Sequence, residues 1–451
     1  MIHKWITITN GDLRVEREQC IDEGKDIASV EKEFDALSSL DLDNDMSLQA
    51  RAEVLLDKTI ALPLKKDYPY VEPSDLDGIR KERPNGVRKM KSSMSDDALM
   101  DKVLGAWQGR CAGCLLGKPV EGWRTPKMWG YLKDSGRFPL TDYFRSDIDS
   151  SIMQKYEINP KGCFINNVDR MVEDDDTNYT VTGFVLMKQK GAAFTSSDMA
   201  AFWMQNIPLL HVCTAERVAY RNFTNSMEPP LSATHRNVYR EWIGAQIRGD
   251  FFGYAALGSP EKAAEFAHRD ASISHVKNGI YGEMWVAAML AAAPFESDAK
   301  NVIETGLSEI PKRSRLAKDI ALVLSWHAEG IGYDEAIKRI HKQWDENNGH
   351  HWCHTNSNAQ IVALGLLWGE NDLEKTICRA VEACFDTDCN GATAGSVMGM
   401  MLGAKKLPSK WIAPMNDTLN TGIDGYHTVK ISKIAEEGFD IHRSLREGGA
   451  L

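Results

Sequence analysis

The sequence lacks an apolar run long enough to cross a membrane. Its longest strongly apolar stretch, Met284 to Pro294, falls well short of the about 20 residues that a transmembrane helix needs. The N-terminal residues MIHKWITITN also lack the charged and then apolar pattern of a secretory signal. We therefore expect no membrane partner and a cytoplasmic location.

An excess of basic residues is also missing, because 53 Lys and Arg stand against 64 Asp and Glu and the net charge is −11. Affinity for nucleic acid comes largely from Lys and Arg that neutralise phosphates. The charge balance therefore argues against a nucleic-acid partner.

The nine cysteines are odd in number and follow no regular spacing, which argues for a reducing compartment rather than a disulfide framework. Cys111 and Cys114 form one CxxC, but no second pair accompanies it at the spacing of a zinc site. We interpret these two residues as small packed side chains, since free cysteine is commonly buried.

Alternating, β-branched strand patterns are absent as well, and a helical period of 3.6 residues dominates from about residue 97 onward. We expect an all-α main domain over residues 96–451, preceded by a polar, mostly helical N-terminal extension over residues 1–95. Helices are predicted at residues 103–117, 179–190, 197–210, 260–269, 280–293, 299–308, 315–328, 334–345, 358–368, 373–384 and 392–404.

Two of these helices carry glycine at every fourth position. One ladder runs from Gly105 to Gly117 and the other from Gly391 to Gly403. Glycine in a helix interior costs about 1 kcal/mol relative to alanine, so such a ladder indicates close backbone approach. We expect the two helices to cross at the centre of the domain.

An acidic segment, VEDDDTNYT from Val172 to Thr180, stands directly before one of the predicted helices. A helix N-terminus favours one or two carboxylates as caps. Adjacent carboxylates about 4 Å apart, however, repel by about 4 kcal/mol at an effective dielectric near 20. The run Asp174, Asp175 and Asp176 therefore indicates a cation site, with a solvated acidic loop as the alternative.

A second acidic segment, CFDTDCNGATAG, places Asp386 and Asp388 just before the other glycine-ladder helix. A D-x-D pair can present both carboxylates to one ion, and hard oxygen ligands suit Mg²⁺, Mn²⁺ or Ca²⁺. We expect both acidic segments to converge on one or two such ions.

A third segment, GAWQGRCAGCLLGKPVEGW, follows the first ladder with Pro119 and then Glu121. Taken alone, Glu121 is most simply a surface residue.

Together, the three segments resemble the ADP-ribosylglycohydrolase family, which includes the dinitrogenase-reductase-activating glycohydrolases. A Gly/Ala-rich helix followed by G-x-P-x-E, a D-D-T opening a helix, and a late D-T-D opening a Gly/Ala-rich helix occur in the family's order within about residues 97–405. The resemblance implies an orthogonal all-α helical bundle with a binuclear magnesium or manganese site.

The resemblance also implies roles for particular residues. Asp175 and Asp176 match the family's paired metal-binding aspartates, Asp386 and Asp388 match the late ligands, and Glu121 matches a residue often assigned to acid/base work. We expect Asp174 to join the metal ligands, and we assign catalytic roles to Glu121, Asp175 and Asp388.

Departures from the family pattern indicate a divergent branch. Asp174 stands where a Thr or Ser is common, Cys389 replaces a common Thr, and Cys114 stands where many members have Asp. The number of metal ions and the identity of the substrate are therefore left open.

Polar residues in two further segments are candidates for substrate binding. The alternatives are ordinary ones, namely helix caps for Asn278 and for the nearby Asn358, and an exposed helix charge for Glu283. The candidates are His275, Asn278, Tyr281 and Glu283 in HVKNGIYGEMW, with His354 and Asn356 in HTNSNAQ.

The predicted function is metal-dependent hydrolysis of an N- or O-glycosidic bond in a ribosyl, ADP-ribosyl or related glycosyl substrate. The partner would be a small-molecule glycoside or an ADP-ribosyl conjugate, and the oligomeric state is left open. Two alternatives remain: a protein that binds ADP-ribose or a glycoside without turnover, and a metal-dependent phosphohydrolase.

Overall fold

The computed structural model describes residues 4–90 and 94–451 of the chain. These residues form 23 α-helices and a single two-stranded antiparallel sheet of β1 (Thr418–Asn420) and β2 (Thr428–Lys430). The predicted all-α fold is confirmed. None of the helices in the described parts is long and apolar enough to span a membrane.

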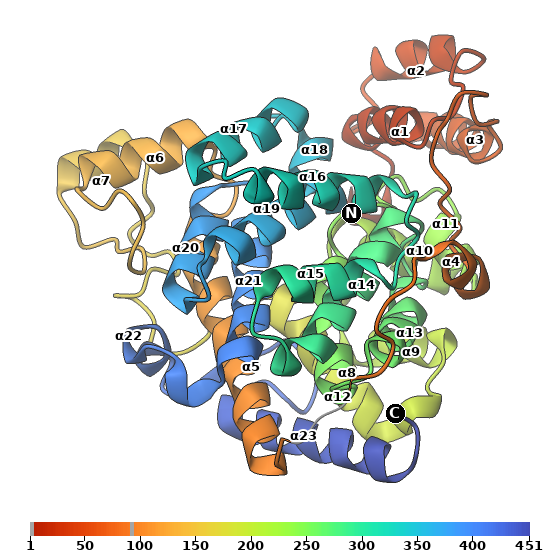
Figure 1. Cartoon of the computed structure of the whole chain (residues 1–451). Helices are drawn as coiled ribbons and strands as arrows, with labels where there is room; N and C mark the ends of the chain where they lie inside the picture. Colours follow the sequence, from red (N-terminus) through yellow and green to blue (C-terminus); the bar gives the residue numbers. More distant parts are fainter. Residues whose placement is uncertain (1–3, 91–93) are drawn as a thin grey trace.

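The two glycine-ladder helices, α5 (Asp96–Gly117) and α21 (Thr387–Leu402), lie side by side at the centre (Figure 1). A Cβ atom added at Gly109 would overlap the carbonyl oxygen of Gly395, and one added at Gly113 would overlap that of Gly391. The glycines therefore permit direct backbone contact, as predicted. The helices do not simply cross at one point, however, because the contacts continue antiparallel along both ladders.

A layer of helices surrounds this central pair. Helix α14 is mostly apolar, and all of its residues are buried, as expected for a helix that is covered on every face. The layer comprises α8 (Asp175–Lys190), α12 (Asp250–Ala255), α13 (Pro260–Ala271), α14 (Asn278–Ala292), α15 (Ala299–Leu307), α16 (Arg315–Ala328), α19 (Thr355–Trp368), α20 (Leu373–Glu382) and α23 (Ile431–Glu447).

Shorter helices lie around this layer. They are α6 (Thr125–Asp134), α7 (Ser150–Lys155), α9 (Ser196–Asn206), α10 (Thr214–Thr224), α11 (Leu231–Thr234), α17 (Tyr333–Gln343), α18 (Gly349–Cys353) and α22 (Ser409–Ile412). The 3-10 turns are η1 (Lys4–Ile6), η2 (Met46–Leu48), η3 (Lys118–Val120), η4 (Gly191–Ala193), η5 (Leu209–His211), η6 (Gln246–Arg248), η7 (Ala293–Phe295), η8 (Ala404–Lys406) and η9 (Ala413–Met415). In the main domain, the helices that were not predicted from the sequence are α6, α7, α10, α11, α12, α18, α22 and α23.

The first part of the chain forms α1 (Asn10–Asp22), α2 (Glu31–Ser38), α3 (Gln49–Ile60) and α4 (Leu76–Glu82). Helices α1 to α3 stand at one edge of the molecule (Figure 1). They share a small hydrophobic core that includes Leu13, Phe34 and Leu55, together with Val238 of the main domain. This arrangement agrees with a helical extension, while a domain boundary at residue 95 stays a prediction.

Candidate metal centre

The aspartates of the first acidic segment, Asp174, Asp175 and Asp176, lie at the start of α8. Asp174 is the N-cap in an extended conformation, and its Oδ1 accepts a hydrogen bond from the Asp176 backbone N–H at 2.9 Å. Asp175 and Asp176 occupy the first helical turn, where the helix dipole favours negative charge. Asp174 and Asp176 are buried, and Asp175 is half-buried.

The late aspartates sit at the start of α21, in the turn that follows α20. Asp386 and Asp388 are both buried. The turn passes through Cys384 and Phe385, whose φ angles of 65° and 60° are strained for residues with a Cβ, at a cost of order 1–3 kcal/mol each. The phosphohydrolase alternative expects a strand before its D-x-D motif, and the helix found here does not support it.

The fold brings the two acidic segments together. Burial and the neighbouring Asp174 and Asp388 raise the pKa of Asp176 well above its ordinary value. Burial also raises the pKa of Asp386, and the closeness of Asp388 and Glu121 adds to the effect. Such crowding of buried carboxylates disfavours their charged forms unless a cation joins them.

Two buried carboxylate oxygens of this group have no hydrogen-bond partner among the described residues. Asp176 Oδ2 and Asp388 Oδ1 are buried and accept no hydrogen bond there. A buried acceptor without a partner is costly, and a bound cation would satisfy both atoms. The donor set is mainly carboxylate oxygen, which fits an ion of the magnesium type.

Two basic residues that the sequence analysis missed contact the early aspartates. Lys118 Nζ lies 2.5 Å from Asp174 Oδ2, and Arg110 Nη2 lies 3.1 Å from Asp176 Oδ1. Burial acts to raise the pKa of Asp174, but the Lys118 ammonium outweighs it and holds that pKa below its ordinary value. A signal was present, since Arg110 is the one charged residue between Val103 and Gly117.

Glu121 follows the η3 turn and is exposed at the edge of this group. Partial desolvation of its carboxyl, together with the nearby Asp174 and Asp175, raises the pKa of Glu121 to about 7. A carboxyl with such a pKa exchanges protons readily near neutral pH. The structure thus places Glu121 beside the aspartates rather than on a remote surface.

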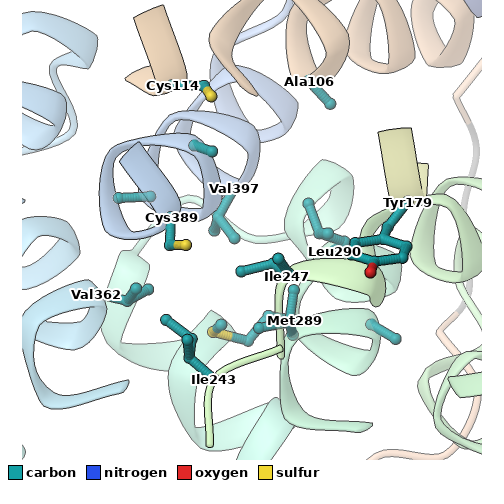
Figure 2. Close-up of a cluster of buried hydrophobic side chains, with 14 of the residues drawn as sticks. Ala106, Cys114, Tyr179, Ile243, Ile247, Met289, Leu290, Val362, Cys389 and Val397 are labelled. Atoms are coloured by element: carbon teal, nitrogen blue, oxygen red, sulfur yellow. The ribbon is translucent and has the colours of Figure 1, made fainter. Parts of the chain in front are cut away.

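Cys114 and Cys389, the two cysteines at which this chain departs from the family pattern, also lie in this group. Cys114 Sγ is within 4.8 Å of carboxylate oxygens of Asp174 and Asp176, and Cys389 has the same relation to Asp386 and Asp388. Burial raises the pKa of both thiols well above the ordinary value. Figure 2 shows Cys389 near Val397, while Cys114 stands farther from the other labelled side chains; both cysteines are buried.

Among the substrate-binding candidates, Asn278 and Tyr281 contact the segment that joins the extension to the main domain. Asn278 Nδ2 donates to Glu72 Oε1 at 2.8 Å and to Glu241 Oε2 at 2.7 Å. The Tyr281 hydroxyl donates to the Pro73 carbonyl at 2.5 Å. Their polar atoms are thus occupied away from the aspartates.

His275 and Glu283 belong to a buried network around Arg248. Glu283 lies 3.6 Å from the Arg248 guanidinium, and His275 lies 4.0 Å from Glu216, which also pairs with Arg248. The interpretation of Glu283 as an exposed helix charge is wrong, because α14 is covered on every side and Glu283 is fully buried.

His354 is the N-cap of α19, and Asn356 lies in the first turn of that helix. His354 Nδ1 accepts from the Asn356 backbone N–H at 3.1 Å, and Asn356 Nδ2 donates to Asp319 at 2.8 Å. The contacts of these six candidates give no support to a role in substrate binding, which stays a prediction.

Asn358, by contrast, contacts the late aspartate segment directly. Its Oδ1 accepts from the Asp386 backbone N–H at 3.1 Å and from Asn390 Nδ2 at 2.8 Å. The sequence suggested Asn358 as a helix cap. In the structure it lies inside α19 and orients the turn that carries Asp386.

A separate group of Asp22, His350 and His354 also has ligand atoms within 4.8 Å of one another. The Trp242 indole donates to His350 Nδ1 at 2.9 Å, so the proton of the neutral ring sits on Nε2, which faces Asp22 Oδ2 at 3.0 Å. A metal ion would need the lone pair of that Nε2. We therefore interpret this group as a hydrogen-bonded contact between α1 and the main domain.

Comparison with known protein families gives a match over most of the chain. The family model described as ADP-ribosylglycohydrolase matches residues 95–444. The chain belongs to the ADP-ribosylglycohydrolase family. A solved structure titled "ADP-ribosylglycohydrolase-related protein complex" is 16% identical, covers 77% of this chain and 99% of its own, and has a TM-score of 0.47. The comparison with curated proteins found no match. Membership of the ADP-ribosylglycohydrolase family supports a glycohydrolase type of function.

Proposed function

We propose that this member of the ADP-ribosylglycohydrolase family is a metal-dependent hydrolase. It would cleave an N- or O-glycosidic bond of a ribosyl, ADP-ribosyl or related furanosyl substrate. The observation that carries the proposal is the pair of unpartnered, buried oxygens of Asp176 and Asp388 beside the near-neutral carboxyl of Glu121.

The metal ligands in this proposal are Asp175, Asp176, Asp386 and Asp388. When bound, an ion of the Mg²⁺, Mn²⁺ or Ca²⁺ type would supply a positive charge that holds vicinal sugar hydroxyls and a water molecule. We leave out Asp174, the remaining predicted ligand, because both of its carboxylate oxygens already have partners.

Glu121 is the proposed general acid or base. Its exposed position leaves the carboxyl open to a substrate, and its pKa of about 7 keeps both protonation states populated near neutral pH. As an acid it would protonate the leaving group, and as a base it would take a proton from water, as carboxyls do in glycoside cleavage.

Asp175 and Asp388 are proposed to orient the reacting groups. Asp175 is half-buried and accepts no hydrogen bond that the structure records for the described residues, so its carboxylate can face a substrate hydroxyl. Asp388 Oδ1 is buried within the group and would help to fix the geometry there. Fixed orientation of reactants is a large source of rate enhancement.

Hydrolysis of a panel of ADP-ribosyl and ribosyl conjugates, with and without chelator, tests the proposal. We expect product release that chelator abolishes and added Mg²⁺ or Mn²⁺ restores. Turnover that continues unchanged in chelator would rule out the metal role.

A second candidate function is binding of ADP-ribose or a related glycoside without turnover. The ion pair between Lys118 and Asp174 favours it, because this pair removes one carboxylate from the ligand set. Calorimetry showing tight binding of ADP-ribose, with no product from any conjugate, would support this alternative.

A further inference from the structure

We infer that the site holds one divalent ion rather than two, and that the ammonium group of Lys118 takes the place of a second cation. This inference rests on the proposed function, because it concerns the same carboxylates. It differs from the binuclear site that the family resemblance implies.

Both carboxylate oxygens of Asp174 already have partners in the chain. Its Oδ1 accepts from the Asp176 N–H at 2.9 Å, and its Oδ2 lies 2.5 Å from Lys118 Nζ. The Cys114 thiol donates a further hydrogen bond to this carboxylate. The negative charge of Asp174 is thus already neutralised by the protein.

The backbone at Lys118 is held in place by its neighbours. It begins the η3 turn directly after Gly117, whose carbonyl accepts a hydrogen bond from the Thr387 hydroxyl at 2.9 Å. A Cβ atom at Gly117 would overlap the Thr387 backbone, so the end of α5 and the start of α21 touch at this point. The backbone that carries Lys118 is therefore anchored beside the start of α21.

Asp176, in the same acidic segment as Asp174, is also partly neutralised. Arg110 is fully buried and pairs with Asp176 Oδ1 and, at 2.9 Å, with Asp250 Oδ2. It also donates to the Asp176 carbonyl at 2.7 Å. Only Oδ2 of Asp176 remains open.

The late segment lacks such partners. Within the described residues, no Lys or Arg forms an ion pair with Asp386 or Asp388. The open oxygens, Asp176 Oδ2 and Asp388 Oδ1, thus have no ammonium or guanidinium as a hydrogen-bond partner among the described residues. One divalent ion can satisfy both of them. A second ion at Asp174 would meet the Lys118 ammonium at hydrogen-bond range and be repelled.

The experiment counts the ions that the full chain binds. Chelator-treated protein is titrated with Mn²⁺, and free Mn²⁺ is followed by electron paramagnetic resonance, so neither substrate nor turnover enters the measurement. We expect one ion per chain. Two tightly bound ions in the wild type would overturn the inference.

Lys118→Met removes the ammonium and keeps a long, unbranched side chain. We expect this variant to bind a second Mn²⁺ ion, because the charge that repels it is gone. The matched control is Lys127→Met, which removes a nearby lysine whose ammonium lies 4.6 Å from the centre of the Trp123 ring; it should still bind one ion. A Lys118→Met protein that binds one ion with wild-type affinity would overturn the role of Lys118.

A second variant keeps the inference testable if Lys118→Met does not fold. Asp174→Asn preserves a good N-cap residue but removes the charge opposite Lys118, and we expect it to lose less affinity for Mn²⁺ than Asp388→Asn does. Asp388→Asn should lose roughly 100-fold or more, because even residues behind metal ligands cost 10–100-fold. Equal losses in the two variants would overturn the inference.

The outcomes also separate this inference from the proposed function. No Mn²⁺ binding by the wild type would overturn the metal-dependent function and this inference together. Two bound ions with chelator-sensitive hydrolysis would overturn this inference and leave the proposed function standing.

Discussion

The side-chain oxygen of Asn358 accepts a hydrogen bond from the backbone N–H of Asp386 at 3.1 Å. The contact joins the interior of α19 to the strained turn that carries a proposed metal ligand. We predict that Asn358→Ala lowers the free energy of unfolding by about 1–3 kcal/mol, since it leaves buried donors without an acceptor. Urea denaturation measures this change, with Asn347→Ala at an exposed position as the control. Equal stability of the two variants would contradict the assigned role.

Replacing Glu121 by Gln should lower kcat by about 10²–10⁴-fold, the usual contribution of a positioned acid or base. Binding of Mn²⁺ should persist, because Glu121 is not among the proposed ligands. Steady-state kinetics and metal titration of the same preparation check both statements, and full turnover of this variant would exclude Glu121 as a catalytic residue.

The pH dependence of activity should report the raised pKa of Glu121, which is about 7 in the metal-free chain. If Glu121 acts as the acid, kcat/KM falls as pH rises through its pKa, and if it acts as the base, kcat/KM falls as pH decreases. The measurement is a pH profile over pH 5 to 9 for wild type. A profile with no titration in this range would contradict both roles.

Stability of the metal-free chain should decrease as pH rises from about 4 toward 7 and above. Burial and neighbouring charges raise the pKa of Asp175, Asp386 and Asp388 in the folded state. The folded chain then binds more protons than the unfolded chain over this window, so the free energy of unfolding falls with increasing pH. Urea denaturation at several pH values, with chelator and with Mn²⁺, measures this effect. Bound metal should flatten the dependence, and a metal-free chain that gains stability over the same window would contradict the crowding of carboxylates.

Gly113→Ala should destabilise the chain by about 1–3 kcal/mol or more, because the added methyl group meets backbone and cannot be accommodated by a side-chain rotation. In the structure the new Cβ would overlap the carbonyl oxygen of Gly391. Gly332→Ala is the control, since nothing lies within 4 Å of its added Cβ. Thermal and urea unfolding compare the two, and a small effect at Gly113 would argue against direct contact of α5 and α21.

Asn278→Ala distinguishes a structural role from the predicted role in substrate binding. We expect a loss of about 1–3 kcal/mol in the free energy of unfolding, because Glu72 and Glu241 lose a donor, with KM unchanged. A raised KM without loss of stability would instead favour contact with substrate.

Local pattern was enough to predict the all-α class, the two glycine ladders and the acidic segments before α8 and α21. Helical period, the cost of glycine and the repulsion between neighbouring carboxylates all act within a few residues along the chain. Such features can be read without knowledge of the fold. The family resemblance added Glu121, which no local pattern singled out.

Contacts between distant segments decided the rest. Lys118 and Asp174 are an ion pair only because the end of α5 meets the start of α8, and Asn358 supports Asp386 only because α19 passes behind α21. Asn278 likewise donates a hydrogen bond to Glu72 only because folding brings these distant residues together. The sequence by itself determined the all-α class, most of the long helices and where carboxylates gather, because those depend on near neighbours. Which basic group neutralises which aspartate was left to the tertiary structure, because partners far apart in the chain become neighbours only on folding.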